Sequence, residues 1–270
     1  MDKIHPTAIV EEGAVIGKDV VLEPYAIVKK NVTLGDRVTI KSHAYIDGHT
    51  TIGDDTTIYP CASIGTKTQA LNYNGETTYV QIGKNCEIRE YVTINSSSEE
   101  GTVVSVGDNS LIMAYCHLAH HCTVGKYVIM SNSSMLAGHV TVEDFAVIGG
   151  MTPVHQNVRI GAHSMVGGFS RVTHDIPPYT IGAGYEYRLG GLNLIGLKRR
   201  GFSLETRTAL SKAYKLTFRS GLPLDEALAR IADEFELLPE ITHWIDFCKN
   251  TDRGFPSAKG EKEKEFAGAK

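Results

Sequence analysis

The strongest constraint in the sequence is a repeat of six residues that runs from residue 4 to residue 172. At fixed intervals an aliphatic residue is followed by Gly, Ala, Asp or Glu, as in Ile16-Gly17, Ile52-Gly53, Val124-Gly125 and Ile160-Gly161. A period of six fits neither a helix nor a plain amphipathic strand. It fits short β-strands joined by tight corners, which bury their apolar faces only by stacking on one another.

Three such units make a triangular coil of 18 residues, so residues 18 apart are expected at the same corner of neighbouring coils, roughly 4.8 Å apart. His121 and His139 have this spacing, and so do His120, Gly138 and Gln156. The sequence therefore predicts a polar column along one edge of the prism, made of the pairs His120/His121, Gly138/His139 and His155/Gln156.

Two polar segments interrupt the repeat without changing its register, at residues 66–79 and 95–102. Loops that leave a solenoid in this way usually lie on its functional face. A tolerated surface insertion is the alternative, because added loop length costs little free energy.

Composition limits the class of protein. The chain has 270 residues, of which 42% are hydrophobic, so it can hold a large core. Its net charge of −4 gives no sign of the basic surface that binds nucleic acid. Its five cysteines fall mostly within the repeat, which indicates buried thiols in a reducing compartment. No apolar run reaches the ~20 residues of a membrane span. We therefore expect a cytoplasmic protein with no integral membrane association.

The repeat predicts a mainly β domain over residues 1–181, ending at the paired prolines Pro177-Pro178. Residues 182–252 are expected to hold a Gly-rich linker (182–196) and helices over residues 203–220, 224–237 and from Pro239 onward. The charged tail, residues 253–270, is expected to be disordered.

Apolar residues at positions expected to face outward suggest that the prism does not stay alone. They are Met113, Tyr115, Met130, Met135, Met151 and Phe169. A ring of three subunits would cover this face, although the C-terminal helices are an alternative cover.

Several motifs resemble those of the acyl-[acyl carrier protein]–UDP-N-acetylglucosamine O-acyltransferase family. They are the run from His117 to Gly125, Leu136 to Val140, Ile148 to Met151, Val154 to Gln156, and Gly196 to Phe202. The resemblance covers roughly residues 4–250. It implies a left-handed parallel β-helix, a homotrimer with sites between subunits, and no cofactor or metal. It also implies transfer of a long, often 3-hydroxylated, acyl group from acyl carrier protein to the 3-hydroxyl of UDP-N-acetylglucosamine, the first step of lipid A biosynthesis.

The resemblance also implies roles for particular residues. His120 matches the general base, and the N–H of Gly138 matches the donor to the oxyanion. Positions that match contacts to the sugar nucleotide or the acyl chain are His117, His139, His155, Gln156, Asn193 and Arg199. Arg200, with Lys198, suits phosphates or the acidic carrier protein. Gly168 matches the end of the acyl groove, where glycine implies a long chain.

The sequence departs from the family pattern at several positions. His121 replaces the usual Asp or Asn after the catalytic histidine, and two adjacent imidazoles disfavour a doubly charged state. Ala70, Asn72 and Ile195 stand where the family has charged residues. Asn95-Ser96 stands where the family has a His-Arg pair. These changes leave the acceptor open between UDP-N-acetylglucosamine and a 3-amino analogue.

Three other functions and one other catalytic mechanism stay open at this point. A non-catalytic binding protein would keep the prism without the reaction. A related N-acyltransferase would usually carry an extra N-terminal domain, whereas here the repeat begins at residue 4. A metal hydratase of the same fold would bind zinc through histidines of adjacent subunits, with His117, His121 and His139 as candidate ligands. A cysteine nucleophile would use Cys122, which is expected to face the core and so to lack the exposure of a reactive thiolate.

Overall fold

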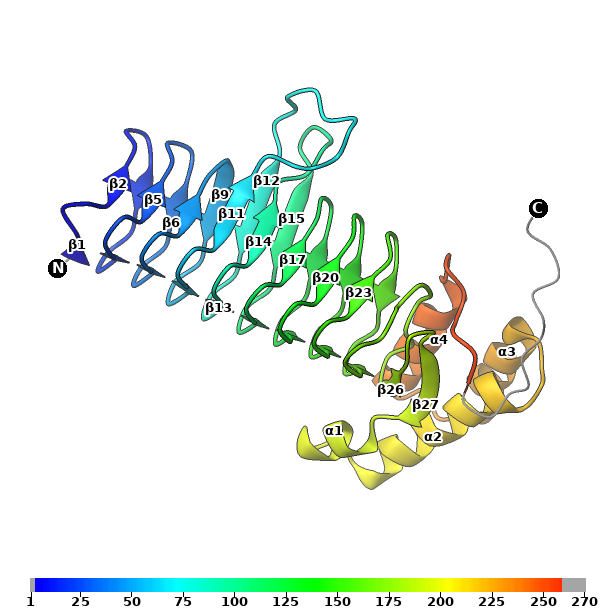
Figure 1. The fold of residues 1–270 in the computed structure, drawn as a ribbon. Helices are drawn as coiled ribbons and strands as arrows, with labels where there is room; N and C mark the ends of the chain where they lie inside the picture. The colour runs from blue at the N-terminus through cyan, green and yellow to red at the C-terminus, as the bar shows by residue number, and fades with distance from the viewer. Residues whose placement is uncertain (1–2, 259–270) are drawn as a thin grey trace.

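Short strands wind around three faces of a long prism, which carries a group of helices at its C-terminal end (Figure 1). The computed structural model describes residues 3–258. The chain visits sheet A, sheet B and sheet C in turn, and each strand pairs in parallel with the strand one coil away. This is the left-handed parallel β-helix that the resemblance implied.

Sheet A consists of β1 (Lys3–Ile4), β4 (Val21–Leu22), β7 (Thr39–Ile40), β10 (Thr57–Ile58), β13 (Glu87–Ile88), β16 (Leu111–Ile112), β19 (Ile129–Met130), β22 (Val147–Ile148), β25 (Met165–Val166), β26 (Thr180–Ala183) and β27 (Arg188–Leu192). Sheet B consists of β2 (Ile9–Val10), β5 (Ile27–Val28), β8 (Tyr45–Ile46), β11 (Ser63–Thr66), β14 (Thr93–Asn95), β17 (His117–Leu118), β20 (Met135–Leu136) and β23 (Pro153–Val154). Sheet C consists of β3 (Val15–Ile16), β6 (Thr33–Leu34), β9 (His49–Ile52), β12 (Tyr79–Ile82), β15 (Val103–Val106), β18 (Thr123–Val124), β21 (Thr141–Val142) and β24 (Arg159–Ile160).

The strand register confirms both the predicted coil length and the two insertions. His117 pairs with Met135, which is the partner that the predicted coil requires. Thr57 pairs with Glu87, a longer step along the chain, because the first loop lies between them. Glu87 pairs with Leu111, a step that is again longer than one regular coil, because the second loop lies between them. Pairing returns to the regular coil after both loops, so neither disturbs the stack.

The interior of the prism is a continuous column of aliphatic side chains from the repeat positions. Ile52, Leu118, Leu136 and Ile148 are fully buried there. Met130 is buried too, so the expectation that it faces outward was wrong: it occupies an aliphatic position of the repeat and fills the core. Tyr115, Met135, Met151 and Phe169 are exposed, as expected.

Most corners turn at the third residue after the aliphatic position, where the backbone is left-handed. His121, His139, Phe145 and His163 have φ between 57° and 62° at such corners. The side chains of successive corner residues stack, as Phe145 does on His163 with ring centroids 4.7 Å apart. Corner residues one coil apart are therefore in direct contact.

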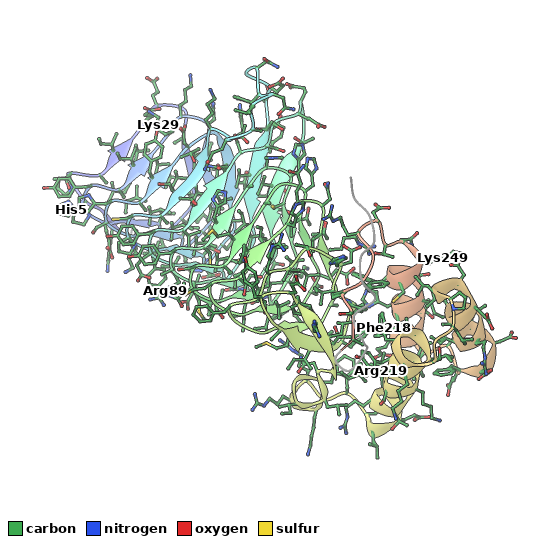
Figure 2. All side chains as sticks on the ribbon, turned by 45° about the vertical axis from the view of Figure 1, so that its right-hand side comes forward. His5, Lys29, Arg89, Phe218, Arg219 and Lys249 are labelled. Atoms are coloured by element: carbon green, nitrogen blue, oxygen red, sulfur yellow. The ribbon has the colours of Figure 1, made fainter. Side chains whose placement is uncertain are left out.

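Four helices follow the prism: α1 (Leu194–Arg199), α2 (Leu204–Arg219), α3 (Leu224–Glu234) and α4 (Pro239–Lys249). Ser203 caps α2, as predicted, by accepting a hydrogen bond from the Thr206 amide. Phe218 lies among these helices (Figure 2). Its ring centroid is 6.0 Å from that of Trp244. His243 joins the helices to the prism, because its Nε2 lies 2.9 Å from Glu143 Oε2. None of the described helices is long and apolar enough to cross a bilayer.

Three expectations for the C-terminal part need correction. The segment 182–196 is not a plain linker, because β26 extends sheet A through the pair Met165–Ile181 and forms an antiparallel hairpin with β27. Helix α3 ends at residue 234 instead of 237. Leu238 has an extended backbone, as residues before a proline usually do, so the helix cannot continue to Pro239.

The first residues of the tail are ordered against the prism, contrary to expectation. The carbonyls of Gly254 and Ser257 accept hydrogen bonds from the amides of Asp175 and Leu189, at 2.9 and 3.1 Å. The rest of the expected disordered tail, residues 259–270, lies outside the described residues. The domain limits at residues 181 and 252 remain a prediction.

Candidate active site

The predicted histidine column exists at the corner between sheets B and C, which we call the B–C corner. The His139 amide donates to the His120 carbonyl at 3.0 Å, and the Asn157 amide donates to the Gly138 carbonyl at 3.1 Å. These bonds link the three coils that carry His120, Gly138 and Gln156. The structure thus places five of the predicted site residues along one edge: His120, Gly138, His139, His155 and Gln156.

Three imidazole rings meet at this corner. Nδ1 of His120 lies 3.0 Å from Nδ1 of His121, within hydrogen-bond distance. The His121 ring stacks on the His139 ring with centroids 4.2 Å apart and planes within 7° of each other. The His120 ring stands edge-on to both, at 5.2 Å from His121 and 5.1 Å from His139. His121, which the spacing placed in the polar column and which departs from the family pattern, is therefore in direct contact with both His120 and His139.

Gly138 provides the space for the His120 ring. A Cβ atom at position 138 would lie 2.2 Å from Cε1 of His120, far inside van der Waals contact. The Gly138 backbone does not have a positive φ, so the need for glycine here is steric. Within the described chain, residues 3–258, the Gly138 amide meets no acceptor, which leaves it available to a bound group.

The rings are in a state that can accept a proton. Burial lowers the pKa of both His120 and His121, and the neighbouring charge of His139 lowers it further. The Glu99 carboxylate acts in the opposite direction on the same two rings. Both imidazoles are thus mainly neutral at pH 7, as a general base must be.

His117 lies on sheet B beside the column. Its Nδ1 is 2.7 Å from the Thr93 hydroxyl on the neighbouring strand β14. Burial lowers the pKa of His117 as well. The hydroxyl fixes the orientation of this ring, and His117 adds a fourth imidazole to the same region.

Two loops border the B–C corner, as the interrupted repeat predicted: residues 67–78 and residues 96–102. They rise together from one part of the prism (Figure 1). The Gly101 amide donates to the Thr77 carbonyl at 2.8 Å, which joins the loops. Glu99 of the second loop places Oε2 3.8 Å from His121 Nε2. Sequence reasoning missed Glu99, although an acidic residue in a loop expected on the functional face was the available signal.

Four of the positions that depart from the family pattern lie in these loops or directly beside them: Ala70, Asn72, Asn95 and Ser96. Gln69 Nε2 donates to Asn95 Oδ1 at 3.3 Å, and Asn95 Nδ2 donates to the Thr66 hydroxyl at 3.0 Å. Asn95 is buried. Its amide therefore serves to join the first loop to sheet B.

A single metal ion does not suit the three rings as they stand. One nitrogen from each of His120, His121 and His139 lies within 4.8 Å of the others. An imidazole binds a metal through a lone pair in the plane of its ring. The nearly parallel, stacked planes of His121 and His139 cannot both contain one ion. This geometry argues against a zinc site in which one chain supplies both His121 and His139.

Cys122 lies two residues from His120 but faces the interior. The residue is fully buried, and its Sγ lies 3.1 Å from the Ala137 carbonyl. Burial raises the pKa of the thiol to about 12. A thiol of this kind is protonated at neutral pH and is no nucleophile.

The other predicted residues lie at other corners of the same chain. Gly168 follows β25 at the corner between sheets A and B, where a Cβ atom at this position would lie 3.2 Å from the Gly150 carbonyl oxygen. Asn193 caps α1 through Gly196 and donates to the His163 carbonyl at 3.0 Å, at the corner between sheets C and A. Arg200 lies at that corner too, with its guanidinium 4.5 Å from the centroid of the Phe145 ring. Arg199, in the last turn of α1, is exposed.

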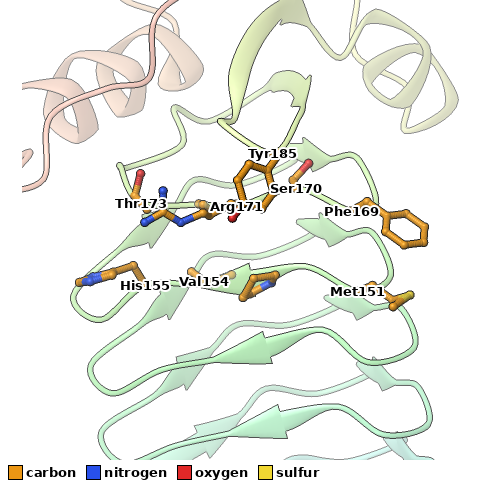
Figure 3. A pocket seen from close by; sticks show the side chains of 10 residues that line it. Met151, Val154, His155, Phe169, Ser170, Arg171, Thr173 and Tyr185 are labelled. Carbon is orange, nitrogen blue, oxygen red and sulfur yellow. The ribbon is translucent and has the colours of Figure 1, made fainter. Parts of the chain in front are cut away.

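A hollow of about 480 Å³ lies on sheet B near the C-terminal end of the prism. His155 marks one edge of it and Met151 and Phe169 the other, with Arg171 and Tyr185 between them (Figure 3). Most of its lining is apolar, which suits a hydrocarbon chain.

Comparison with known proteins agrees with this architecture. Residues 13–48 and 104–138 match the family model described as bacterial transferase hexapeptide (six repeats). Residues 175–255 match the model described as domain 2 of UDP N-acetylglucosamine O-acyltransferase. The repeat and the C-terminal helices are therefore both recognised.

Two relatives and one solved structure show the family of this chain. Acyl-[acyl-carrier-protein]–UDP-N-acetylglucosamine O-acyltransferases from Chlamydia abortus and Chlamydia caviae are 56% and 57% identical over 260 residues, 96% of this chain and 91% of each relative. The solved structure of UDP-N-acetylglucosamine acyltransferase from Campylobacter jejuni is 40% identical, with a TM-score of 0.89 over 95% of this chain and all of that one. The chain therefore belongs to the UDP-N-acetylglucosamine O-acyltransferase family.

Proposed function

We propose that this protein transfers a long fatty acyl group, often 3-hydroxylated, from acyl carrier protein to the 3-hydroxyl of UDP-N-acetylglucosamine, the first step of lipid A biosynthesis. The names of the similar proteins indicate the donor and the acceptor. The observation that carries the proposal is the packing of the His120 ring against Gly138, which pairs a neutral imidazole with an unoccupied backbone amide.

His120 acts as the general base. A sugar hydroxyl is a weak nucleophile at neutral pH, and an imidazole whose pKa is lowered by burial is unprotonated there. His120 removes the hydroxyl proton as the oxygen attacks the thioester carbonyl. The new C–O bond forms, the carbonyl oxygen becomes an oxyanion, and the proton resides on the imidazole.

The Gly138 amide donates to that oxyanion. A fixed backbone N–H aimed at the developing charge is the usual way in which acyl transferases stabilise a tetrahedral intermediate. Collapse of the intermediate breaks the C–S bond, and the protonated His120 returns its proton to the departing thiolate. The products are the ester and the free thiol of the carrier, so neither a cofactor nor a covalent acyl-enzyme is needed.

The active form is a homotrimer with its sites between subunits. The exposed apolar residues Tyr115, Met135, Met151 and Phe169 lie on sheet B and on its border with sheet A. Burial of such a face against a second copy is favourable. Some of the proposed site residues lie away from the B–C corner of their own chain: Gly168, Asn193, Arg199 and Arg200. In the assembly, the second copy would bring these residues to the B–C corner of the first.

Within such a site, His117 and His139 contact the sugar ring, and His155 and Gln156 continue the contact along the same corner. Asn193 and Arg199 contact the nucleotide, and Gly168 closes the acyl groove. Arg200 and Lys198 meet the phosphates or the acidic carrier protein. The substrates and the five free cysteines both indicate the cytoplasm.

The test is to mix the purified protein with UDP-N-acetylglucosamine and acyl carrier proteins that carry chains of graded length. A 3-O-acyl product identified by its mass, made fastest with a long chain, supports the proposal. A parallel reaction with the 3-amino analogue decides the acceptor. The absence of an acylated product with either sugar would refute the proposal and favour a binding protein.

A further inference from the structure

The contact between Nδ1 of His120 and Nδ1 of His121 restricts the protonation states of the two rings. The two Nδ1 atoms are 3.0 Å apart, so one must carry a proton and the other must accept it. If His120 donates, its Nε2 is left with a free lone pair. If His121 donates, Nε2 of neutral His120 carries the proton and His120 cannot act as a base at that nitrogen.

The other nitrogen of His121 decides between these two states. Nε2 of His121 is buried and makes no hydrogen bond among the described residues. The Glu99 carboxylate approaches it to 3.8 Å from the loop of residues 96–102. A carboxylate accepts hydrogen bonds, so it favours the tautomer of His121 that carries its proton on Nε2. In that tautomer Nδ1 of His121 is an acceptor, and His120 must be the donor.

We propose that Glu99 and His121 are positioning residues that hold His120 in the tautomer with its proton on Nδ1 and its lone pair on Nε2. The chain Glu99–His121–His120 supplies the orienting acceptor that an Asp or Asn would supply directly. His139 supports it from the far side, because its ring stacks on His121 and limits the rotation of that ring. This proposal rests on the proposed function of His120 as the base.

Position 121 allows a direct test, because its φ is 58° and Asn tolerates this left-handed conformation best among the polar residues. In His121→Asn the side-chain oxygen accepts from His120 Nδ1 without any help from Glu99. We expect Glu99→Gln to lower kcat by at least about tenfold in the unchanged protein and to leave kcat unchanged in the His121→Asn background.

Glu100→Gln is the matched control. It removes the same charge from the same loop, but the Glu100 carboxylate accepts from the Thr77 amide and does not face the histidines. We expect it to keep the rate of the unchanged protein. Glu99→Gln should also move the acidic limb of the kcat/KM profile to lower pH, because the Glu99 charge raises the pKa of His120. Equal effects of the two substitutions, or an equal effect of Glu99→Gln in both backgrounds, would overturn the proposal.

A second measurement does not depend on activity. Nitrogen-15 NMR of protein labelled at histidine distinguishes the two neutral tautomers. We expect the Nδ1–H form for His120 and the Nε2–H form for His121 at pH 8. The Nε2–H form at His120 would contradict the tautomer assignment even if the transfer reaction were confirmed.

Discussion

The His120 ring occupies the space in which any side chain at position 138 would lie. Gly138 and His120 stand one coil apart at the B–C corner, so the packing follows from the repeat of the coil and not from a local motif. The glycine thereby leaves room for the His120 ring, and its amide makes no hydrogen bond among the described residues. In the proposed mechanism this packing places the general base beside the donor to the oxyanion.

Gly138→Ala should reduce activity without unfolding the protein. The methyl group would start 2.2 Å from the His120 ring and force it out of position. Misplacement of a reacting group by about 1 Å costs on the order of 10²-fold in rate. Gly190→Ala is a suitable control, because its Cβ would meet the Ile181 carbonyl oxygen at 3.2 Å in the hairpin of β26 and β27, away from the histidines. An unchanged kcat in Gly138→Ala, with circular dichroism unchanged, would contradict the assigned packing.

Cys122→Val should retain both the fold and the rate. Position 122 faces the core, and the equivalent residue one coil on is Val140, which is also fully buried. The native thiol should resist alkylation in the folded state, because burial raises its pKa to about 12. Mass spectrometry after treatment with iodoacetamide checks the modification. Loss of activity on modification of Cys122 in the folded protein would revive a cysteine nucleophile.

The stability of the protein should fall in acid partly because of His163. Burial, together with the charges of Arg200 and His243, lowers the pKa of His163 to about 4 in the folded state. The unfolded chain then binds more protons than the folded one, so stability is lost as the pH falls from about 6.5 toward 4. The loss due to this residue is at most about 3 kcal/mol.

His163→Phe should remove this part of the pH dependence. Phenylalanine already occupies the equivalent left-handed corner at Phe145 and can keep the stack on that ring. Thermal unfolding between pH 4 and pH 7 measures the effect. The melting temperature of the variant should fall less between pH 7 and pH 4 than that of the unchanged protein, whereas parallel curves would show that His163 contributes nothing to acid sensitivity.

Phe169→Glu should dissociate the trimer. Phe169 is 72% exposed in the single chain, and a charge placed there would be buried without a partner in the assembly. Light scattering should give three times the mass of one chain for the unchanged protein and the mass of one chain for the variant, with activity lost in parallel. Val15→Glu, at an exposed position of β3 in the first coils, should stay trimeric. If the unchanged protein were a fully active monomer, the proposal that its sites lie between subunits would be contradicted.

The prism was largely predictable because its period is strict. A period of six fixes which residues point inward, and this placed His120 beside Gly138 and His121 beside His139 before any coordinates. The same rule was misapplied at Met130, which falls on an inward position. The hairpin of β26 and β27 was missed because it follows no repeat and depends on pairing with β25.

The repeat does not predict the position of the loop that carries Glu99. Its position depends on contacts such as that between Gly101 and Thr77, which join segments far apart in the sequence. The stacking of His121 on His139 was expected from the spacing, but the contact with Glu99 was not. Resemblance to the family suggested His120 and Gly138 as the base and the oxyanion donor, whereas the proposed role of His121 and Glu99 could be inferred only from the structure.

The most direct test of the central claim is the rate of acyl transfer by His120→Gln. Glutamine is similar in size and polar but cannot act as a base at neutral pH. We predict a fall in kcat on the order of 10²-fold or more, with the trimer and the melting temperature preserved. In the unchanged protein the acidic limb of kcat/KM should lie below about pH 6.5, because burial lowers the pKa of His120. A His120→Gln protein that transfers the acyl group at the original rate would contradict the account.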